Sequence, residues 1–208
     1  MDNSKLKIKE AIFREEFDKL TEDMKEDMAG SNLLEEIDKY CIDNSIPNVD
    51  EQVGKLFSIL VKTSGAKNIL ETGTGVGYST IWLALAAREN KGKVLTIERN
   101  SNHASIAREY FKKANLKNIN LLNGEALVLL QNIDEKFDFV FIDATKDEYI
   151  YYIKLISTKL VKPALIVADN AISHAIEVSD YLDYVRTDEN ISSVLIPIRA
   201  GLELSYFN

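Results

Sequence analysis

The sequence predicts an α/β domain with a mostly parallel sheet, and three observations lead to this class. After Gly65, short apolar runs alternate with amphipathic helical stretches, which is the pattern of βαβ units. The last two apolar runs are separated by a short turn at 200–201, which indicates an antiparallel hairpin at one edge of the sheet. A chain of 208 residues, 46% hydrophobic and 28% charged, suits a single globular domain.

Residues 1–64 are predicted to be a helical extension of the domain formed by 65–208. In the first stretch, apolar residues recur at helical spacing with charged residues between them, at Ile8, Ile12, Phe13, Phe17 and Leu20. This apolar stripe exceeds what one edge of a small sheet is expected to cover. We therefore expect the N-terminal helices to pack in a homodimer.

Two more helices are expected before the first strand. Ser31 can cap a helix over 33–37, and Asp50 can cap another over 53–60, after a break at Pro47. The remaining elements alternate between strands and helices. Strands are expected at 67–71, 93–98, 119–123, 137–143, 164–170, 192–198 and 202–207. Helices are expected at 78–90, 104–114, 126–130, 147–160 and 174–187.

Charge and composition restrict the possible partners. The net charge of −8 disfavours a nucleic acid, because proteins that bind one usually present a basic face. The single Cys41 excludes an intrachain disulfide and a multi-cysteine metal cluster. The charged first ten residues do not resemble a signal peptide, and no apolar run approaches the ~20 residues that cross a bilayer. We expect a cytoplasmic protein without a membrane partner.

A glycine-rich loop, ETGTGVGYS, follows the first predicted strand and opens a helix. Gly73, Gly75 and Gly77 allow a tight turn and a close approach to a ligand in the crevice where nucleotide-like ligands bind. The dinucleotide motif reads G-x-G-x-x-G beside a pyrophosphate, whereas this loop reads G-x-G-x-G and follows Glu71. A carboxylate there repels a pyrophosphate and suits a cationic sulfonium with its ammonium group. The loop therefore predicts S-adenosylmethionine.

A second carboxylate, Glu98, ends the strand predicted over 93–98. Acidic residues at this position commonly bind the ribose hydroxyls of an adenosine, in dinucleotide folds and methyltransferases alike. Glu98 therefore supports an adenosine-containing cofactor without choosing between the two classes. For Glu71, the alternative is a carboxylate at the loop entry that faces water.

Carboxylate and amide side chains end two further predicted strands. Asp143 follows one strand, and Asp169 with Asn170 follows the next. Because the carboxyl ends of these strands meet above one crevice, the side chains can hold Mg²⁺ or another divalent cation. Lys146 would lie over the same pocket as a base or as a fixed positive charge. The alternative is that Asp143 and Asp169 only cap the helices that follow.

From about residue 45 to its end, the chain resembles the cation-dependent O-methyltransferases typified by catechol and caffeoyl-CoA O-methyltransferases. The matching segments are ILETGTGVGYSTIWLA, VLTIERN, FDFVFIDATKDEY, LIVADN and IPIRAGLELS. The pair FIDATKDEY and IVADN is the more specific, since many methyltransferases carry a similar glycine loop. The resemblance implies the Rossmann-like methyltransferase fold, with a mostly parallel seven-stranded sheet, an antiparallel edge hairpin and N-terminal helices.

The resemblance also implies roles for individual residues. Cofactor contacts fall on Val49, Glu71, Gly73, Tyr78, Ser79, Glu98, Glu125, Ala126 and Asp143. Metal ligands fall on Asp143, Asp169 and Asn170, and the proposed base falls on Lys146. Glu203 falls where the catechol enzymes place a glutamate that contacts a substrate hydroxyl. Members of the family usually form dimers.

The acceptor side departs from the family pattern at two places. The usual insertion after the DN motif is absent, and 199–201 reads RAG instead of GDG. We therefore expect a more open acceptor pocket. His174 and Tyr149 are candidates for acceptor contact, whereas His103 is expected in solvent and Trp82 in the core.

Together these observations predict a divalent-metal-dependent O-methyltransferase acting on a small catechol-like or hydroxycinnamoyl-like acceptor. Two alternatives stay open. The first is methylation of a hydroxylated tRNA base, which the acidic charge disfavours and the open acceptor side favours. The second is a non-catalytic S-adenosylmethionine-binding protein, which would have no need of the set Asp143, Lys146, Asp169 and Asn170.

Overall fold

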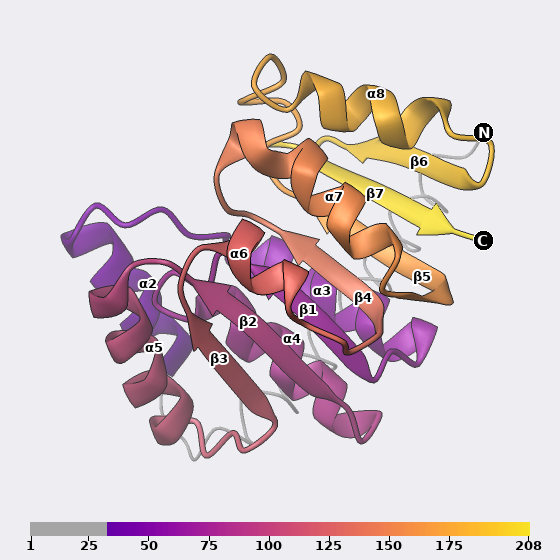
Figure 1. Ribbon diagram of the computed structural model, residues 1–208. Helices are drawn as coiled ribbons and strands as arrows, with labels where there is room; N and C mark the ends of the chain where they lie inside the picture. Colours follow the sequence, from indigo (N-terminus) through magenta and orange to yellow (C-terminus); the bar gives the residue numbers. More distant parts are fainter. Residues whose placement is uncertain (1–32) are drawn as a thin grey trace, which may run out of the picture.

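The computed structural model describes residues 33–208, which form one α/β domain around a seven-stranded sheet (Figure 1). The apolar stripe between Ile8 and Leu20, the cap at Ser31 and the dimer contacts predicted for this stretch lie outside the described residues. Within residues 33–208, every helix is too short or too polar to cross a membrane.

The strand order β3-β2-β1-β4-β5-β7-β6 confirms the predicted sheet. The strands are β1 (Asn68–Thr72), β2 (Lys93–Glu98), β3 (Ile119–Asn123), β4 (Phe137–Ile142), β5 (Leu160–Ala168), β6 (Ile191–Ile196) and β7 (Leu202–Phe207). β1 to β5 run parallel to one another, and β7 runs antiparallel to both β5 and β6. The predicted edge hairpin is therefore confirmed, with β6 as the outer strand.

Helices cover both faces of the sheet. They are α2 (Leu33–Asp43), α3 (Glu51–Ser64), α4 (Tyr78–Glu89), α5 (Ser101–Lys113), α6 (Ala126–Gln131), α7 (Tyr149–Ser157) and α8 (Ser179–Thr187), with a 3₁₀ turn η1 (Lys146–Glu148) before α7. One apolar core joins α2, α3, α4 and α5 to the sheet, and a second lies under α6, α7 and α8. Figure 1 shows α7 and α8 in front of the sheet and α3 and α4 behind it.

Two residues of the sequence determine where α3, the helix before the glycine loop, begins and ends. Asp50 caps α3 as predicted, because its Oδ1 accepts a hydrogen bond from the Val53 amide at 2.9 Å. Gly65 ends the same helix with φ of 70°. Trp82 on α4 is fully buried, which confirms its predicted place in the core.

Two predicted helices are shorter than expected. The helix predicted over 174–187 begins only at Ser179, because the backbone after Asn170 is bonded to the hairpin turn instead. The Ile172 amide donates to the Ala200 carbonyl at 2.8 Å, and the Ala171 amide donates to the Gly201 carbonyl at 2.9 Å. The helix predicted over 147–160 ends at Ser157, because the chain from Leu160 already pairs with β4.

The contact between α3 and α4 leads to a stability prediction. Gly54 lies flat against the indole of Trp82, so a Cβ at this position would be 2.4 Å from the Trp82 Nε1. Gly54→Ala should lower the free energy of unfolding by about 1–3 kcal/mol through overpacking, although Ala is the better helix former. Urea denaturation measures the change. Thr63→Ala, on the exposed side of the same helix, should stay within about 0.5 kcal/mol of wild type. An unchanged Gly54→Ala midpoint would contradict the close packing.

Candidate functional site

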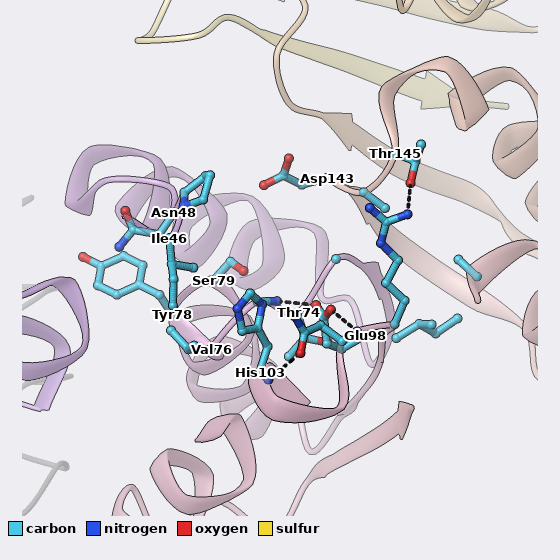
Figure 2. Close-up of a pocket in the computed structure, with 18 of the residues that line it drawn as sticks. Ile46, Asn48, Thr74, Val76, Tyr78, Ser79, Glu98, His103, Asp143 and Thr145 are labelled. Atoms are coloured by element: carbon cyan, nitrogen blue, oxygen red, sulfur yellow. Dashed lines mark hydrogen bonds between the residues drawn. The ribbon is translucent and has the colours of Figure 1, made fainter. Parts of the chain in front are cut away.

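A cavity of about 460 Å³ opens at the carboxyl ends of β1, β2 and β4. It is lined by the segments 46–49, 73–76, 78–79, 97–100, 124–126 and 143–146, together with His103 and Tyr152. Figure 2 shows the Asp143 carboxylate across the pocket from His103, with Ile46 and Asn48 along one wall and Glu98 on the other side. The size suits a small-molecule ligand. The cavity thus lies where the sequence predicted a ligand site, above the carboxyl ends of the parallel strands.

The glycine loop, which follows β1, lies in close contact with the carboxyl end of β4. Gly73 has φ of 95°, and a Cβ there would come within 1.9 Å of the Asp143 carbonyl oxygen. Only glycine permits this approach. The Gly73 amide donates to the Ile97 carbonyl at 2.9 Å, so the loop is also fixed to β2. The glycine loop and the backbone of Asp143 are therefore fixed relative to each other.

Glu98 lies at the pocket, as predicted, and organises the backbone around it. Its Oε2 accepts from the Gly75 amide at 2.8 Å, and its Oε1 accepts from the Asn100 amide at 2.7 Å. These bonds join the glycine loop to the start of α5. The other predicted cofactor residues that line the cavity are Val49, Gly73, Tyr78, Ser79, Glu125, Ala126 and Asp143.

The structure places Glu71 behind the cavity wall, and its predicted contact with the cofactor stays a prediction. Its side chain is fully buried and does not line the cavity. Its carboxylate accepts hydrogen bonds from Ser79 Oγ at 2.6 Å, from Thr96 Oγ1 at 2.6 Å, and from the Thr80 hydroxyl. Burial raises the pKa of Glu71, and the three hydroxyls oppose that rise. Because Ser79 itself lines the cavity, Glu71 positions this wall residue from behind.

Asp143 and Asp169 lie at the ends of neighbouring strands. The Asp143 amide donates to the Thr72 carbonyl at 2.9 Å, and the Asp169 amide donates to the Ile142 carbonyl at 3.0 Å, so both backbones are fixed by the sheet. Burial raises the pKa of Asp143, Lys146 lowers it, and the charge of Asp169 raises it further. Burial also raises the pKa of Asp169. The two acids therefore share a site with an excess of negative charge.

Lys146 is held at this pair of acids. Its Nζ donates to Asp143 Oδ1 at 2.6 Å and to the Tyr149 hydroxyl at 3.1 Å. Tyr149 is fully buried beneath the lysine and does not line this cavity, and its predicted contact with an acceptor stays a prediction. Tyr152 also lines the cavity. Its hydroxyl is bonded to Glu148.

The donor atoms fit a hard divalent cation. Asn170 donates its side-chain Nδ2 to Ser173 Oγ at 3.0 Å, so its amide oxygen is the atom that could serve as a metal ligand. Among residues 33–208, no three His, Cys, Asp or Glu side chains come together as a metal cluster. A cation here would therefore depend on Asp143, Asp169 and Asn170, with other oxygens completing its coordination.

Known proteins resemble this chain over most of its length. A model of the O-methyltransferase family matches residues 24–206. The chain belongs to this O-methyltransferase family, whose members are S-adenosylmethionine-dependent enzymes. The crystal structure of the O-methyltransferase from Bacillus cereus in complex with SAH (S-adenosylhomocysteine) superposes with a TM-score of 0.78 at 29% identity, covering 86% of this chain and 91% of that one. The Rossmann-like methyltransferase fold is thereby confirmed.

Two curated relatives are named catechol O-methyltransferases. The protein from Niastella koreensis is 37% identical over 151 residues, which cover 70% of this chain and 65% of the relative. The protein from Mycobacterium tuberculosis is 37% identical over 126 residues, which cover 60% and 57%. The chain thus spans rather less than two thirds of the length of these two relatives.

Glu203, predicted to contact a substrate, does not line this cavity, and that contact stays a prediction. It is fully buried on β7 and faces α8, where Arg186 donates from Nε at 2.8 Å and from Nη2 at 2.6 Å. Ser193 Oγ donates to the same carboxylate at 2.7 Å. His174 lies outside the cavity lining but near Asp169, whose pKa its charge lowers. Its acceptor contact stays a prediction.

Among the lining residues that the sequence did not predict, two carry polar side chains from the region just after β2. His103, expected in solvent, lines the cavity from the first turn of α5. Arg99 also lines it, and its Nη1 donates to Thr145 Oγ1 at 3.3 Å, which links the end of β2 to the loop after β4 (Figure 2). The available signal was position, because both residues closely follow the carboxylate that ends β2.

The burial of Glu71 leads to a prediction about cofactor binding. Glu71→Ala removes the acceptor of three buried hydroxyls, so the free energy of unfolding should fall by about 2–4 kcal/mol. Binding of S-adenosylhomocysteine, measured by calorimetry, should weaken about tenfold, because Ser79 is no longer oriented. Ser79→Ala should weaken binding similarly at a smaller cost in stability.

The double variant separates this indirect role from direct contact. If Glu71 acts through Ser79, binding to the double variant should be no weaker than binding to Glu71→Ala. Additive losses would instead mean that Glu71 contacts the cofactor itself.

Proposed function

We propose that this protein transfers a methyl group from S-adenosylmethionine to a hydroxyl of a small catechol-like or hydroxycinnamoyl-like acceptor, with the help of a divalent cation such as Mg²⁺. The observation that carries the proposal is that Asp143 and Lys146 line a cavity built on the glycine loop, while Asp169 ends the neighbouring strand close enough to act on the pKa of Asp143. The relatives named catechol O-methyltransferases support the acceptor class.

The cofactor would supply an electrophilic methyl group on its sulfonium. Glu98 would accept hydrogen bonds from the ribose hydroxyls, since its carboxylate is fixed at the pocket by two backbone amides. Val49, Tyr78 and Ser79 would enclose the methionine end, and Glu125 with Ala126 would flank the adenine. The Bacillus cereus relative, whose structure is a complex with SAH, supports this assignment.

The metal would be held by Asp143, Asp169 and Asn170, and it would lower the pKa of an acceptor hydroxyl. Such a cation favours an acceptor with two adjacent oxygens, because both can then complete its coordination. The negative charge that Asp143 and Asp169 share supports a cation at this place.

Lys146 is the proposed base. Its Nζ is fixed between Asp143 and Tyr149, so the nitrogen is positioned at the pocket wall without any rearrangement. After the Lys146 ammonium has lost a proton to solvent, its neutral Nζ takes the acceptor proton, a bond forms between the acceptor oxygen and the methyl carbon, and the bond from that carbon to sulfur breaks. The products are a methyl ether and S-adenosylhomocysteine. Positioning and stabilisation of the oxyanion would supply much of the acceleration.

The most direct test is an acceptor screen with labelled cofactor and Mg²⁺. Catechols and hydroxycinnamoyl thioesters should be methylated, and bulk tRNA should not, in keeping with the net charge of −8. Methylation of tRNA alone would replace the proposed acceptor class. Cofactor binding without transfer to any acceptor would favour a sensor. Tight NAD binding with none of S-adenosylhomocysteine would refute the cofactor assignment.

A cytoplasmic location and a homodimer also stay proposals. The homodimer rests on the N-terminal apolar stripe, which has helical spacing in the sequence. Light scattering at micromolar concentration tests it, and a monomer would refute it.

The metal assignment predicts a specific loss of turnover. Asp169→Ala should fold and bind S-adenosylhomocysteine normally, because the cofactor residues lie on other elements. It should lose about 10²-fold or more in methyl transfer, as should the wild type in a chelator. Asp180→Ala, an exposed acid on α8, is the matched control and should keep full activity. Full wild-type turnover in EDTA would overturn the assignment and return Asp143 and Asp169 to capping roles.

A further inference from the structure

The segment 169–178 connects β5 to α8 and begins with two of the three residues proposed to hold a divalent cation (Figure 1). These two, Asp169 and Asn170, differ in a way that matters for a metal. Both oxygens of a carboxylate can bind a cation, whereas an amide has an oxygen on one side and an NH₂ group on the other. An Asn170 amide turned by half a revolution would direct N–H donors at the cation. The site therefore needs a contact that holds this amide in one orientation.

Ser173 is bonded to the nitrogen of this amide. Asn170 Nδ2 donates to Ser173 Oγ at 3.0 Å, and the same serine oxygen lies 2.9 Å from Nδ1 of His174. A serine hydroxyl has one proton and two lone pairs. In the tautomer of His174 that carries its proton on Nε2, Nδ1 accepts the serine proton. The Ser173 oxygen is then only an acceptor towards Asn170, and Nδ2 is the amide atom that it can bind.

The main chain holds Ser173 in this place, although the residue is exposed. The Ser173 amide donates to the Ala200 carbonyl at 3.0 Å, which ties the residue to the turn between β6 and β7. The Asn170 carbonyl accepts from the His174 amide at 3.0 Å and closes the turn 170–174. Asn170 itself has φ of 65°, a left-handed conformation that asparagine adopts more readily than most residues. The backbone therefore fixes both partners of the side-chain bond independently of a metal.

We propose that Ser173 is a positioning residue for the metal, and that His174 supports it from the other side. Ser173 fixes the Asn170 amide by its nitrogen and so leaves Oδ1 for the cation. This inference rests on the proposed metal dependence and adds two residues to it. Residues that bond to a metal ligand from behind commonly change the metal affinity by about 10- to 100-fold when they are removed. Neither Ser173 nor His174 needs to contact the cation itself.

The affinity for Mn²⁺ tests the proposal without reference to methyl transfer. Electron paramagnetic resonance measures the free ion in a titration of the full-length protein saturated with S-adenosylhomocysteine. Asp169→Ala gives the background from Mn²⁺ bound elsewhere on this acidic chain. Ser173→Ala should weaken the binding above that background about tenfold, whereas Ser173→Thr, which keeps the hydroxyl, should stay within about twofold of wild type. Ser179→Ala, at an exposed serine that begins α8, is the matched control and should bind like wild type.

A second pair of variants separates the orientation of the amide from a general effect on the loop. Asn170→Asp replaces the amide with a carboxylate, whose two oxygens are equivalent and need no orientation. Adding Ser173→Ala to Asn170→Asp should therefore change the Mn²⁺ affinity by less than about twofold, although the same substitution costs about tenfold beside the amide. His174→Ala should cause part of the Ser173→Ala loss, because the serine proton then loses its nitrogen acceptor and can turn to Oδ1 of Asn170.

Two results would overturn this inference and leave the metal assignment in place. One is a Ser173→Ala variant that binds Mn²⁺ as tightly as the wild type. The other is an equal loss beside the amide and beside the carboxylate, which would mean that Ser173 only stabilises the loop. A wild type that binds no more Mn²⁺ than Asp169→Ala would overturn the metal assignment itself, and this inference with it. Thermal unfolding of each variant confirms that it is folded.

Discussion

The site depends on one close contact, in which Gly73 lies against the backbone of Asp143. This contact is possible only without a side chain at position 73, and it joins the central strand β1 to its neighbour β4 at their carboxyl ends. The segments that line the cavity extend from this contact in two directions. The glycine loop extends from it to Glu98 on one side, and the acids of β4 and β5 follow on the other. The cofactor region and the acceptor region are therefore held at a constant separation by main-chain geometry.

Electrostatics give this rigid frame its preference for cationic ligands. Glu71, Asp143 and Asp169 lie close enough that Glu71 and Asp169 both raise the pKa of Asp143, and burial acts in the same direction. Lys146 balances part of the charge. A sulfonium beside the glycine loop and a divalent cation beside the strand ends would each relieve the remaining repulsion. The same carboxylates would be unfavourable neighbours for a pyrophosphate, in agreement with the choice made from the loop spacing.

Much of the fold followed from periodicity, because strand and helix patterns differ in spacing and the turns are marked by glycine and asparagine. The position of the pocket was predicted from topology alone, because the carboxyl ends of the parallel strands meet at one edge of the sheet. Periodicity does not predict which atoms a side chain contacts. Glu203 has the expected strand position, and its carboxylate is bonded to Arg186 from a helix whose phase no pattern of the sequence reveals. His103 was expected in solvent because of its polar neighbours in the sequence, but it lines the cavity.

The hydrogen bonds between 171–173 and the turn at 200–201 give the acceptor side a separate support. They hold the chain just after Asn170 to a surface hairpin rather than to the strands that carry the glycine loop. Gly201 lies against Ile172, so even a methyl group added at this turn would displace the neighbouring backbone. A substitution in this short turn would therefore shift the chain next to Asn170, which the proposed metal site uses, while the glycine loop stays in place. Related proteins could diverge in substrate by this route, and a directed library confined to 198–201 would explore the same freedom.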